Sequence, residues 1–468
     1  MSLPWRFSSA DDYVRGTIKK LKSNETHFSH LKIGKYYLHG DALDNSHIIS
    51  LFEQAQRNPH VKELSLCGVS MNASAVTALV DLLGSRHDDA RRDWTKIVLN
   101  SCQGPAAMAL SMPPDHSIQT ISITKCNLTS HDFLSLGMIL KFSTTLTTLE
   151  ITEETLDGKG ALALAEGIKT AKYLTTLELS YCTFDDEGTS ALVEGLAANQ
   201  HLESLLLPGC ELEDTQAAQL FQSLKNHPCL NQMTLFRNHC GADGAMALET
   251  LLSAPTGDTN PLQPSKAISK LDLSYQQFER ANKLDVSLIA SSLAMNCTLM
   301  CLSLSFNKLN DNDAESLAKV LRQNTTLQEL DLRANNIRDR GVIALATELV
   351  QQSTLRNLFL FGNPFGEQGA NVLLEAIRHN TVLQVLNMDY NSRSYEEIQY
   401  YACLNHAGRK LLKTELVCPA IWPLVFERAE IVSRRSRGVC SGPDVIYHLL
   451  RGPAVLNRRA SSSSNDES

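Results

Sequence analysis

Apolar residues recur along this chain in an order that repeats every 28 residues between positions 299 and 391. Each copy has leucine at its first, fourth and sixth places and asparagine at its ninth, and the three complete copies begin at Leu299, Leu327 and Leu355. The alternation at the fourth and sixth places predicts a short strand with two buried side chains. The asparagine is suited to turn the chain and to satisfy backbone groups in the bend.

The second half of each copy predicts a helix. Residues 158–168, GKGALALAEGI, space their apolar side chains three and four apart, as in an amphipathic helix. Strands should therefore stack in parallel on one side and helices on the other. Because helices are wider than the ~4.8 Å spacing of strands, we expect the strands on the concave face of a curved stack.

The same pattern extends over residues 28–392, with interruptions. A charged insert occupies residues 85–93, the third unit is short, and a loop rich in Pro, Gly and Thr lengthens the eighth unit at 253–266. We count thirteen units, which begin at residues 28, 61, 94, 118, 146, 174, 202, 230, 268, 299, 327, 355 and 383.

Both ends of the array are predicted to be capped, because an end repeat would otherwise leave its core open to water. Residues 1–27 predict an N-terminal cap with a helix that starts after Ser9. Residues 393–456 predict a helical C-terminal cap, whose first helix starts at a capping box of Ser394 and Glu397. Residues 457–468 have the polar composition of a disordered tail.

Charge and hydropathy exclude several classes of partner. The 468 residues carry a net charge of −8, and no broad basic footprint indicates a nucleic-acid ligand. No apolar run has the length of a signal peptide or of a membrane span. We therefore expect no nucleic-acid or membrane partner. We also expect a monomer.

The twelve cysteines include no Cys-x-x-Cys pair. Cys102, Cys126, Cys182 and Cys210 occupy the asparagine position of their repeats. We expect them to be buried, reduced thiols that bond the turn backbone, and not disulfides or zinc ligands. Reduced cysteines predict a cytoplasmic protein, with the nucleus as the alternative.

The sequence contains no motif for catalysis or cofactor binding. It lacks a phosphate-binding Gly-x-x-x-x-Gly-Lys-Ser/Thr loop, a His-Glu-x-x-His pair and a Gly-x-Ser-x-Gly elbow. The fourteen histidines are scattered, and no acidic or thiol pair accompanies His27 and His30. We expect no enzymatic activity, no cofactor and no metal site.

Aromatic and apolar side chains on the expected concave face form the candidate binding site. Most outward positions of the strands are small or polar, as on a solvated sheet face, whereas aromatic anchors are favoured at protein interfaces. The alternative is that these side chains lean on each other, or are covered by the loop at 253–266 or by the C-terminal helices. The candidates are Tyr181, Leu206, Pro208, Phe236, Tyr275, Phe306, Phe359, Phe361 and Tyr390.

One candidate modification site lies near the C-terminus. The run Arg458-Arg459-Ala460-Ser461 resembles a basophilic kinase site. Phosphorylation of Ser461 would add negative charge to the tail.

The units at Leu299, Leu327 and Leu355 resemble leucine-rich repeats of the ribonuclease-inhibitor-like type, and the resemblance extends over residues 28–392. It implies an α/β solenoid shaped as a horseshoe, with a parallel β-sheet on the concave face and helices on the convex face. The family includes ribonuclease inhibitor, Ran GTPase-activating protein and the sensor arrays of NOD-like receptors, so the resemblance leaves the function open.

Three functions are considered on this basis. The leading expectation is a non-enzymatic scaffold that binds a protein partner on the concave face. An alternative is a GTPase-activating or regulatory protein of the Ran GTPase-activating type. That family has an acidic C-terminal tail, whereas residues 391–468 hold 11 lysines and arginines against 8 acidic residues. The other alternative is a ubiquitin-ligase substrate receptor, for which no F-box is evident.

Overall fold

The computed structural model describes residues 9–23, 27–34, 43–84, 86–87, 90–91, 94–102, 117–253, 268–276, 284–352, 354–389, 392–406 and 408–409. The chain divides into two compact units, one of residues 1–238 and 260–267 and the other of residues 239–259 and 268–468. Tyr390, Ser461, the loop after Ser253 and the C-terminal cap and tail beyond Arg409 lie outside the described residues.

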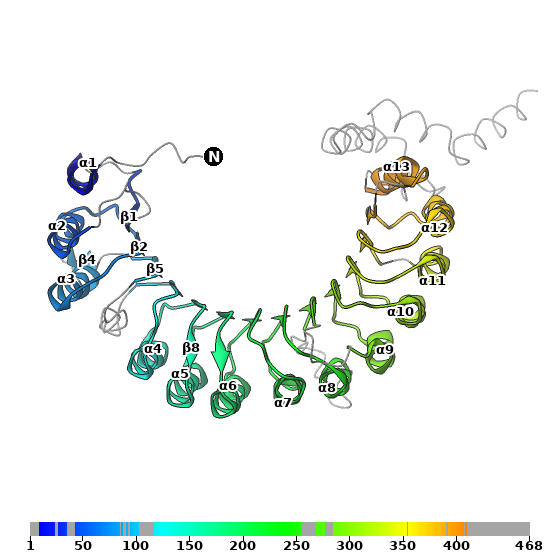
Figure 1. The fold of residues 1–468 in the computed structure, drawn as a ribbon, viewed down its shortest axis with the longest axis horizontal. Helices are drawn as coiled ribbons and strands as arrows, with labels where there is room; N and C mark the ends of the chain where they lie inside the picture. Colours follow the sequence, from blue (N-terminus) through cyan, green and yellow to red (C-terminus); the bar gives the residue numbers. More distant parts are fainter. Residues whose placement is uncertain are drawn as a thin grey trace, which may run out of the picture. The chain divides into compact units, whose positions relative to one another are not determined.

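In the first unit, parallel strands follow one another in chain order, and the helices form a second layer on one side of them (Figure 1). The strands are β1 (His30–Gly34), β2 (Glu63–Cys67), β5 (Lys96–Asn100), β6 (Thr120–Thr124), β7 (Thr148–Thr152), β9 (Thr176–Ser180), β11 (Ser204–Leu206) and β12 (Gln232–Thr234). The helices are α1 (Ala10–Ser23), α2 (Asn45–Gln56), α3 (Ala73–Gly84), α4 (Ser130–Phe142), α5 (Gly158–Thr170), α6 (Asp186–Ala198) and α7 (Asp214–Leu224). Two small additions are the antiparallel pair β3 (Arg86–His87) and β4 (Ala90–Arg91), and the parallel pair β8 (Thr155–Leu156) and β10 (Thr183–Phe184).

The second unit has the same alternation. Its strands are β13 (Lys270–Asp272), β14 (Cys301–Ser303), β15 (Glu329–Asp331), β16 (Asn357–Phe359) and β17 (Val385–Asn387), again parallel and in chain order. Its helices are α8 (Ala242–Leu252), α9 (Val286–Met295), α10 (Asp311–Gln323), α11 (Asp339–Leu349), α12 (Glu367–His379) and α13 (Tyr395–His406).

The predicted α/β solenoid of alternating parallel strands and helices is confirmed. Each strand of the parallel stacks starts two residues after a repeat start inferred from the sequence. Leucines at equal repeat positions lie in register, as Leu302, Leu330 and Leu358 do, and all three are buried. The hydrophobic core therefore lies between the strands and the helices, and it continues from each repeat into the next.

The asparagine position links neighbouring repeats. The Asn335 Nδ2 atom donates to the carbonyl of Leu304 at 3.0 Å, and its Oδ1 atom accepts from the amides of Asn307 and Leu309 at 2.9 and 3.0 Å. Asn307 and Asn363 make equivalent bonds. Each of these three repeats thus satisfies backbone groups of the previous one.

The predicted role of the cysteines at this position is confirmed. Cys102, Cys126, Cys182 and Cys210 are buried free thiols. The Cys182 and Cys210 thiols donate to the carbonyls of Ile151 and Leu179, with Sγ to oxygen distances of 3.5 and 2.8 Å. They replace the donor function of asparagine.

The helix ends test two predicted caps. The Ser9 hydroxyl accepts from the amide of Asp12 at 3.1 Å, as expected for the start of α1. The capping box predicted for Ser394 and Glu397 is wrong. Ser394 Oγ donates to Asn371 at 2.6 Å and Glu397 accepts from Arg378 at 2.5 Å, so both side chains fasten α13 to α12.

No helix in the described ranges is long and apolar enough to cross a membrane. Within the same residues, no three His, Cys, Asp or Glu side chains are grouped so that they could hold a metal ion.

Candidate functional site

The residue just before the asparagine position has a positive φ in most repeats. Ala334 and Gly362 have φ values of 51° and 76°, and the Ala334 amide donates to the carbonyl of Phe361 in the next repeat at 2.8 Å. This left-handed conformation costs a residue with a β-carbon roughly 1 kcal/mol. The fold requires only a residue that tolerates the conformation, so bulky side chains here are not a requirement of the turn.

Two aromatic candidates occupy this turn position in the second unit. Tyr275 and Phe306 have φ values of 61° and 58° and are 38% and 49% exposed. Their ring centroids lie 5.7 Å apart at an interplanar angle of 48°. The two rings do lean on each other, yet about half of the Phe306 side chain still faces solvent.

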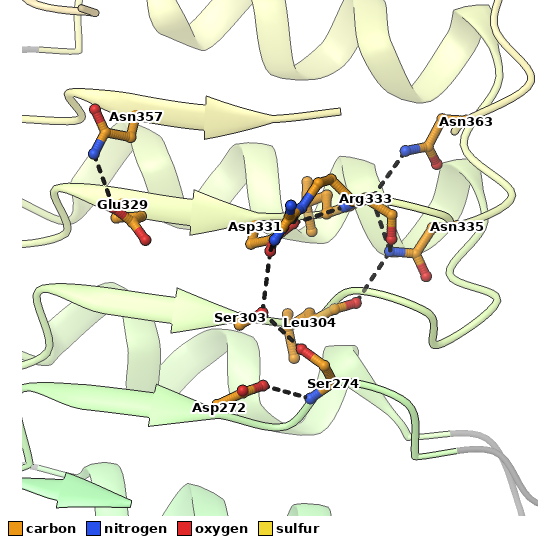
Figure 2. A network of polar contacts seen from close by, with 11 residues as sticks. Asp272, Ser274, Ser303, Leu304, Glu329, Asp331, Arg333, Asn335, Asn357 and Asn363 are labelled. Atoms are coloured by element: carbon orange, nitrogen blue, oxygen red, sulfur yellow. Dashed lines mark hydrogen bonds and ion pairs between the residues drawn. The ribbon is translucent and has the colours of Figure 1, made fainter. Parts of the chain in front are cut away.

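Phe359 is half-buried, and Arg333 from the previous repeat lies over its ring, with Cζ 5.3 Å from the ring centroid. The Asp331 carboxylate binds the same guanidinium through Nε at 2.9 Å and Nη2 at 2.6 Å (Figure 2). This pairing with Asp331 raises the pKa of Arg333. Arginine stacked on an aromatic ring and bonded through two nitrogens to a carboxylate is held in one orientation.

Arg333 was not among the residues singled out from the sequence. Asp331 ends β15 and Arg333 follows two residues later, so continued alternation would place both on the same face and could have indicated the ion pair. The stacking of Arg333 on Phe359 could not be predicted from the sequence, because the two residues belong to different repeats.

Polar side chains around this pair form a network on the same face (Figure 2). Ser303 Oγ lies 2.7 Å from Ser274 Oγ and donates to Asp331 at 3.4 Å, and Asn357 donates to Glu329 at 2.8 Å. The outward charged residues of β13–β17 and the residues just after these strands are Lys270, Asp272, Glu329, Asp331, Arg333 and Asp389. Carboxylates outnumber cations, so the face is acidic beside the exposed ring of Phe361.

The candidates of the first unit form a second group. Leu206 on β11 pairs with Thr234 on β12, and the Gly209 amide donates to the carbonyl of Phe236 at 2.7 Å. Leu206 at the end of β11, Pro208 two residues after it and Phe236 two residues after β12 are therefore neighbours, as the sequence indicated. All three are half-buried, so they present less apolar surface than Phe306 or Phe361.

Tyr181 lies close to this group and has its own environment. It is 42% exposed, has a φ of 53°, and Arg237 Cζ lies 5.7 Å from the ring centroid. A β-carbon on Gly209 would come within 2.5 Å of the Tyr181 ring, so this glycine makes room for it. The ring borders an open hollow of about 450 Å³, lined by Glu153, Glu154, Thr155, Tyr181, Thr183 and Arg237.

Glu154 fills the asparagine position of its repeat and is buried. Its carboxyl group accepts from the amide of Cys126 and, at 2.8 Å, from the amide of Leu128. Burial raises the pKa of Glu154. The sequence analysis did not identify Glu154, because a carboxyl group at the asparagine position becomes notable only when it is known to be buried.

Comparison with known proteins identifies the repeat. A model of the family described as "Leucine Rich repeat" matches residues 170–193, 296–318 and 323–346. The units are leucine-rich repeats. A search of curated protein sequences found no match to the chain.

The solved structures similar to the chain include the following three. An internalin (InlF) from Listeria monocytogenes has 15% identity and a TM-score of 0.40, over 83% of this chain and 92% of that one. The C-terminal domain of tropomodulin from Caenorhabditis elegans has 14% identity and a TM-score of 0.26, over 27% of this chain and 78% of that one. Actin-binding site 2 of leiomodin-1 has 20% identity and a TM-score of 0.25, over 27% of this chain and 74% of that one. Similarity this low carries no information about function.

Proposed function

We propose that this leucine-rich repeat protein is a non-enzymatic scaffold that holds a protein partner against the strand side of its repeats. The observation that carries the proposal is the pair Tyr275 and Phe306. Both are exposed aromatic residues at turns that require only a positive φ. Because the fold does not account for them, and because aromatic anchors dominate protein interfaces, a partner is the best explanation.

The polar surroundings support the same function. Arg333 is fixed by Asp331 and Phe359 before any partner arrives, which lowers the entropy that binding would cost. Arginine and aromatic side chains are the most frequent hot spots of interfaces. The free cysteines fit a reducing compartment, so we propose a location in the cytoplasm or the nucleus. We also propose that the repeats are of the ribonuclease-inhibitor-like type.

The test is a variant that combines Tyr275→Gly, Phe306→Gly and Phe361→Ala. Glycine occurs naturally at equivalent turns, as Gly209 and Gly362, so the variant should fold. Wild-type and variant chains are used as baits for affinity purification with mass spectrometry. Proteins captured by the wild type should be lost from the variant by at least tenfold.

The matched control is Met246→Ala. Met246 is 59% exposed on α8 of the same unit, on the helix side. This variant should capture the same proteins as the wild type. Unchanged capture by the triple variant would contradict the proposal, and so would equal loss from the control, which would indicate unspecific adhesion.

A further inference from the structure

Helix α4 carries an apolar stripe on its solvent side. Leu134, Met138 and Phe142 are 50%, 49% and 48% exposed. They are four residues apart and therefore lie above one another on one face of the helix. The solvent face of a surface helix is ordinarily polar, so this stripe is an exception.

The repeat itself does not require apolar residues at these places. The residues at the same repeat positions are Leu162, Glu166 and Thr170 on α5 and Ser190, Glu194 and Ala198 on α6. Only Leu162, which is 51% exposed, is a large apolar side chain among these six residues. The stripe is thus specific to α4 and the adjoining part of α5.

Glycines bring α4 and α5 unusually close. A β-carbon on Gly167 would lie 2.4 Å from the Gly137 Cα atom, and one on Gly137 would lie 2.4 Å from the Ala163 carbonyl oxygen. Packed helices usually keep their axes 8–10 Å apart, and contacts without side chains allow the lower end of that range. The two helices lie side by side (Figure 1), so Leu162 and the α4 stripe belong to one surface.

The charge around this surface is positive. The exposed lysines and carboxylates on α4 and α5 and at their ends are Lys141, Asp157, Lys159, Glu166, Lys169 and Lys172, so lysines outnumber carboxylates. Lys169 pairs with Glu166 at 3.7 Å. Lys141 Nζ lies 5.4 Å from the ring centroid of Phe142. Lysines therefore flank the stripe in a chain whose net charge is −8.

We propose that the stripe of Leu134, Met138 and Phe142, with Leu162 beside it, is a docking site for an acidic amphipathic helix of a partner protein. The three side chains span roughly 12 Å along α4, which matches a ridge that a second helix can pack against. The lysines select acidic flanks on that helix by charge complementarity. The site lies on the helix side of the repeats, so it adds a second binding face to the strand-side scaffold.

The test is a selection from a displayed library of 20-residue helical peptides with one randomised face. The bait is the full wild-type chain, and no variant is used during the selection. We expect the selected peptides to carry apolar residues three and four apart, flanked by Asp and Glu. By fluorescence anisotropy, Met138→Glu should raise the Kd of such a peptide at least tenfold, Lys141→Glu should raise it several-fold, and added salt should weaken binding.

Met246→Glu is the matched control, because it charges an exposed methionine on a different helix and should leave the Kd unchanged. All three variants should keep the thermal midpoint of the wild type. The proposal is overturned if no selected peptide depends on Met138, or if the selected peptides are not acidic. It is also overturned if Met138→Glu abolishes binding to anionic vesicles or a self-association of the chain instead, because the occupant would then be a lipid surface or a second copy.

Discussion

At the scale of single residues, the asparagine position is filled in most repeats by Asn, Cys, Gln or Glu, which differ in hydrogen-bonding capacity, and in the second repeat by Val69. Asn335 both donates and accepts, and Cys182 donates to the backbone of the previous repeat. Gln276 accepts from the amide of Cys240 at 3.0 Å and donates to the carbonyl of Ser274 at 3.3 Å. Glu154 can only accept when it is ionised. Its repeat therefore has a buried carboxylate and lacks the donor that an amide would supply.

Replacing Glu154 by glutamine should stabilise the protein, and more so at neutral than at acid pH. The raised pKa of Glu154 means that the folded state keeps a proton that the unfolded state has already lost. Stability therefore falls as pH rises from the ordinary glutamate pKa, about 4.3, through the raised one. Glu154→Gln removes this loss and should gain about 1 kcal/mol at pH 7, as measured by urea unfolding at pH 4, 5.5 and 7.

Glu153→Gln is the comparison variant, because Glu153 is exposed and paired with Lys125 at 2.5 Å. Exposed pairs contribute little, so this change should be nearly neutral at each pH. An effect of Glu154→Gln that is the same at all three pH values would refute the role of its ionisation.

At the scale of elements, the spacing of helices is set by what stands between them. Gly137 and Gly167 allow α4 to contact α5 through backbone atoms, and Gly195 does the same for α6 against Ala165. Neighbouring strands are held at a fixed spacing by their hydrogen bonds. The distance between neighbouring helices can therefore vary from repeat to repeat. This distance decides whether outer side chains such as Leu134 and Leu162 form one surface.

Gly167→Ala should destabilise the protein by about 2 kcal/mol, since its β-carbon would meet the backbone of Gly137 and overpack the contact. The comparison is Gly84→Ala at the end of α3, where a β-carbon meets nothing within 4 Å. That change should be neutral or stabilising by up to about 1 kcal/mol. Urea unfolding of both variants decides the matter, and a neutral Gly167→Ala would show that the two helices can separate freely.

At the scale of the whole molecule, stability is distributed over contacts between adjacent repeats, inside each of the two units. The hydrogen bonds of Asn335 reach residues of the neighbouring repeat and of its own turn. In such arrays the folding free energy is close to a sum of nearest-neighbour terms. A substitution that removes contacts between two repeats should therefore unfold only the repeats near it.

Asn335→Ala should cost about 3 kcal/mol, because it leaves two buried amides without an acceptor. Hydrogen exchange followed by mass spectrometry should show faster exchange in β14–β16, whereas β6–β9 of the first unit keep their protection. Asn336→Ala changes an exposed neighbour and should leave exchange as in the wild type. Equal acceleration in both units would contradict the local model.

The sequence by itself determined the repeat and most of its internal chemistry. The strand starts, the buried leucines at positions such as Leu302 and Leu330, and the thiols of Cys182 and Cys210 all followed from periodicity. They could be read because each is fixed by its place in the repeat. Alternation on a strand and spacing on a helix determine which side of the element a residue faces.

Only the tertiary structure decided which side chains meet across repeats. Arg333 over Phe359, Arg237 over Tyr181 and the use of Ser394 and Glu397 against α12 each join residues whose spacing along the chain carries no signal. The physical reason is that a side chain reaching into the next repeat depends on rotamers, on room left by residues such as Gly209, and on local charge. The sequence therefore determines the scaffold, whereas contacts between repeats determine the surfaces that it offers to a partner.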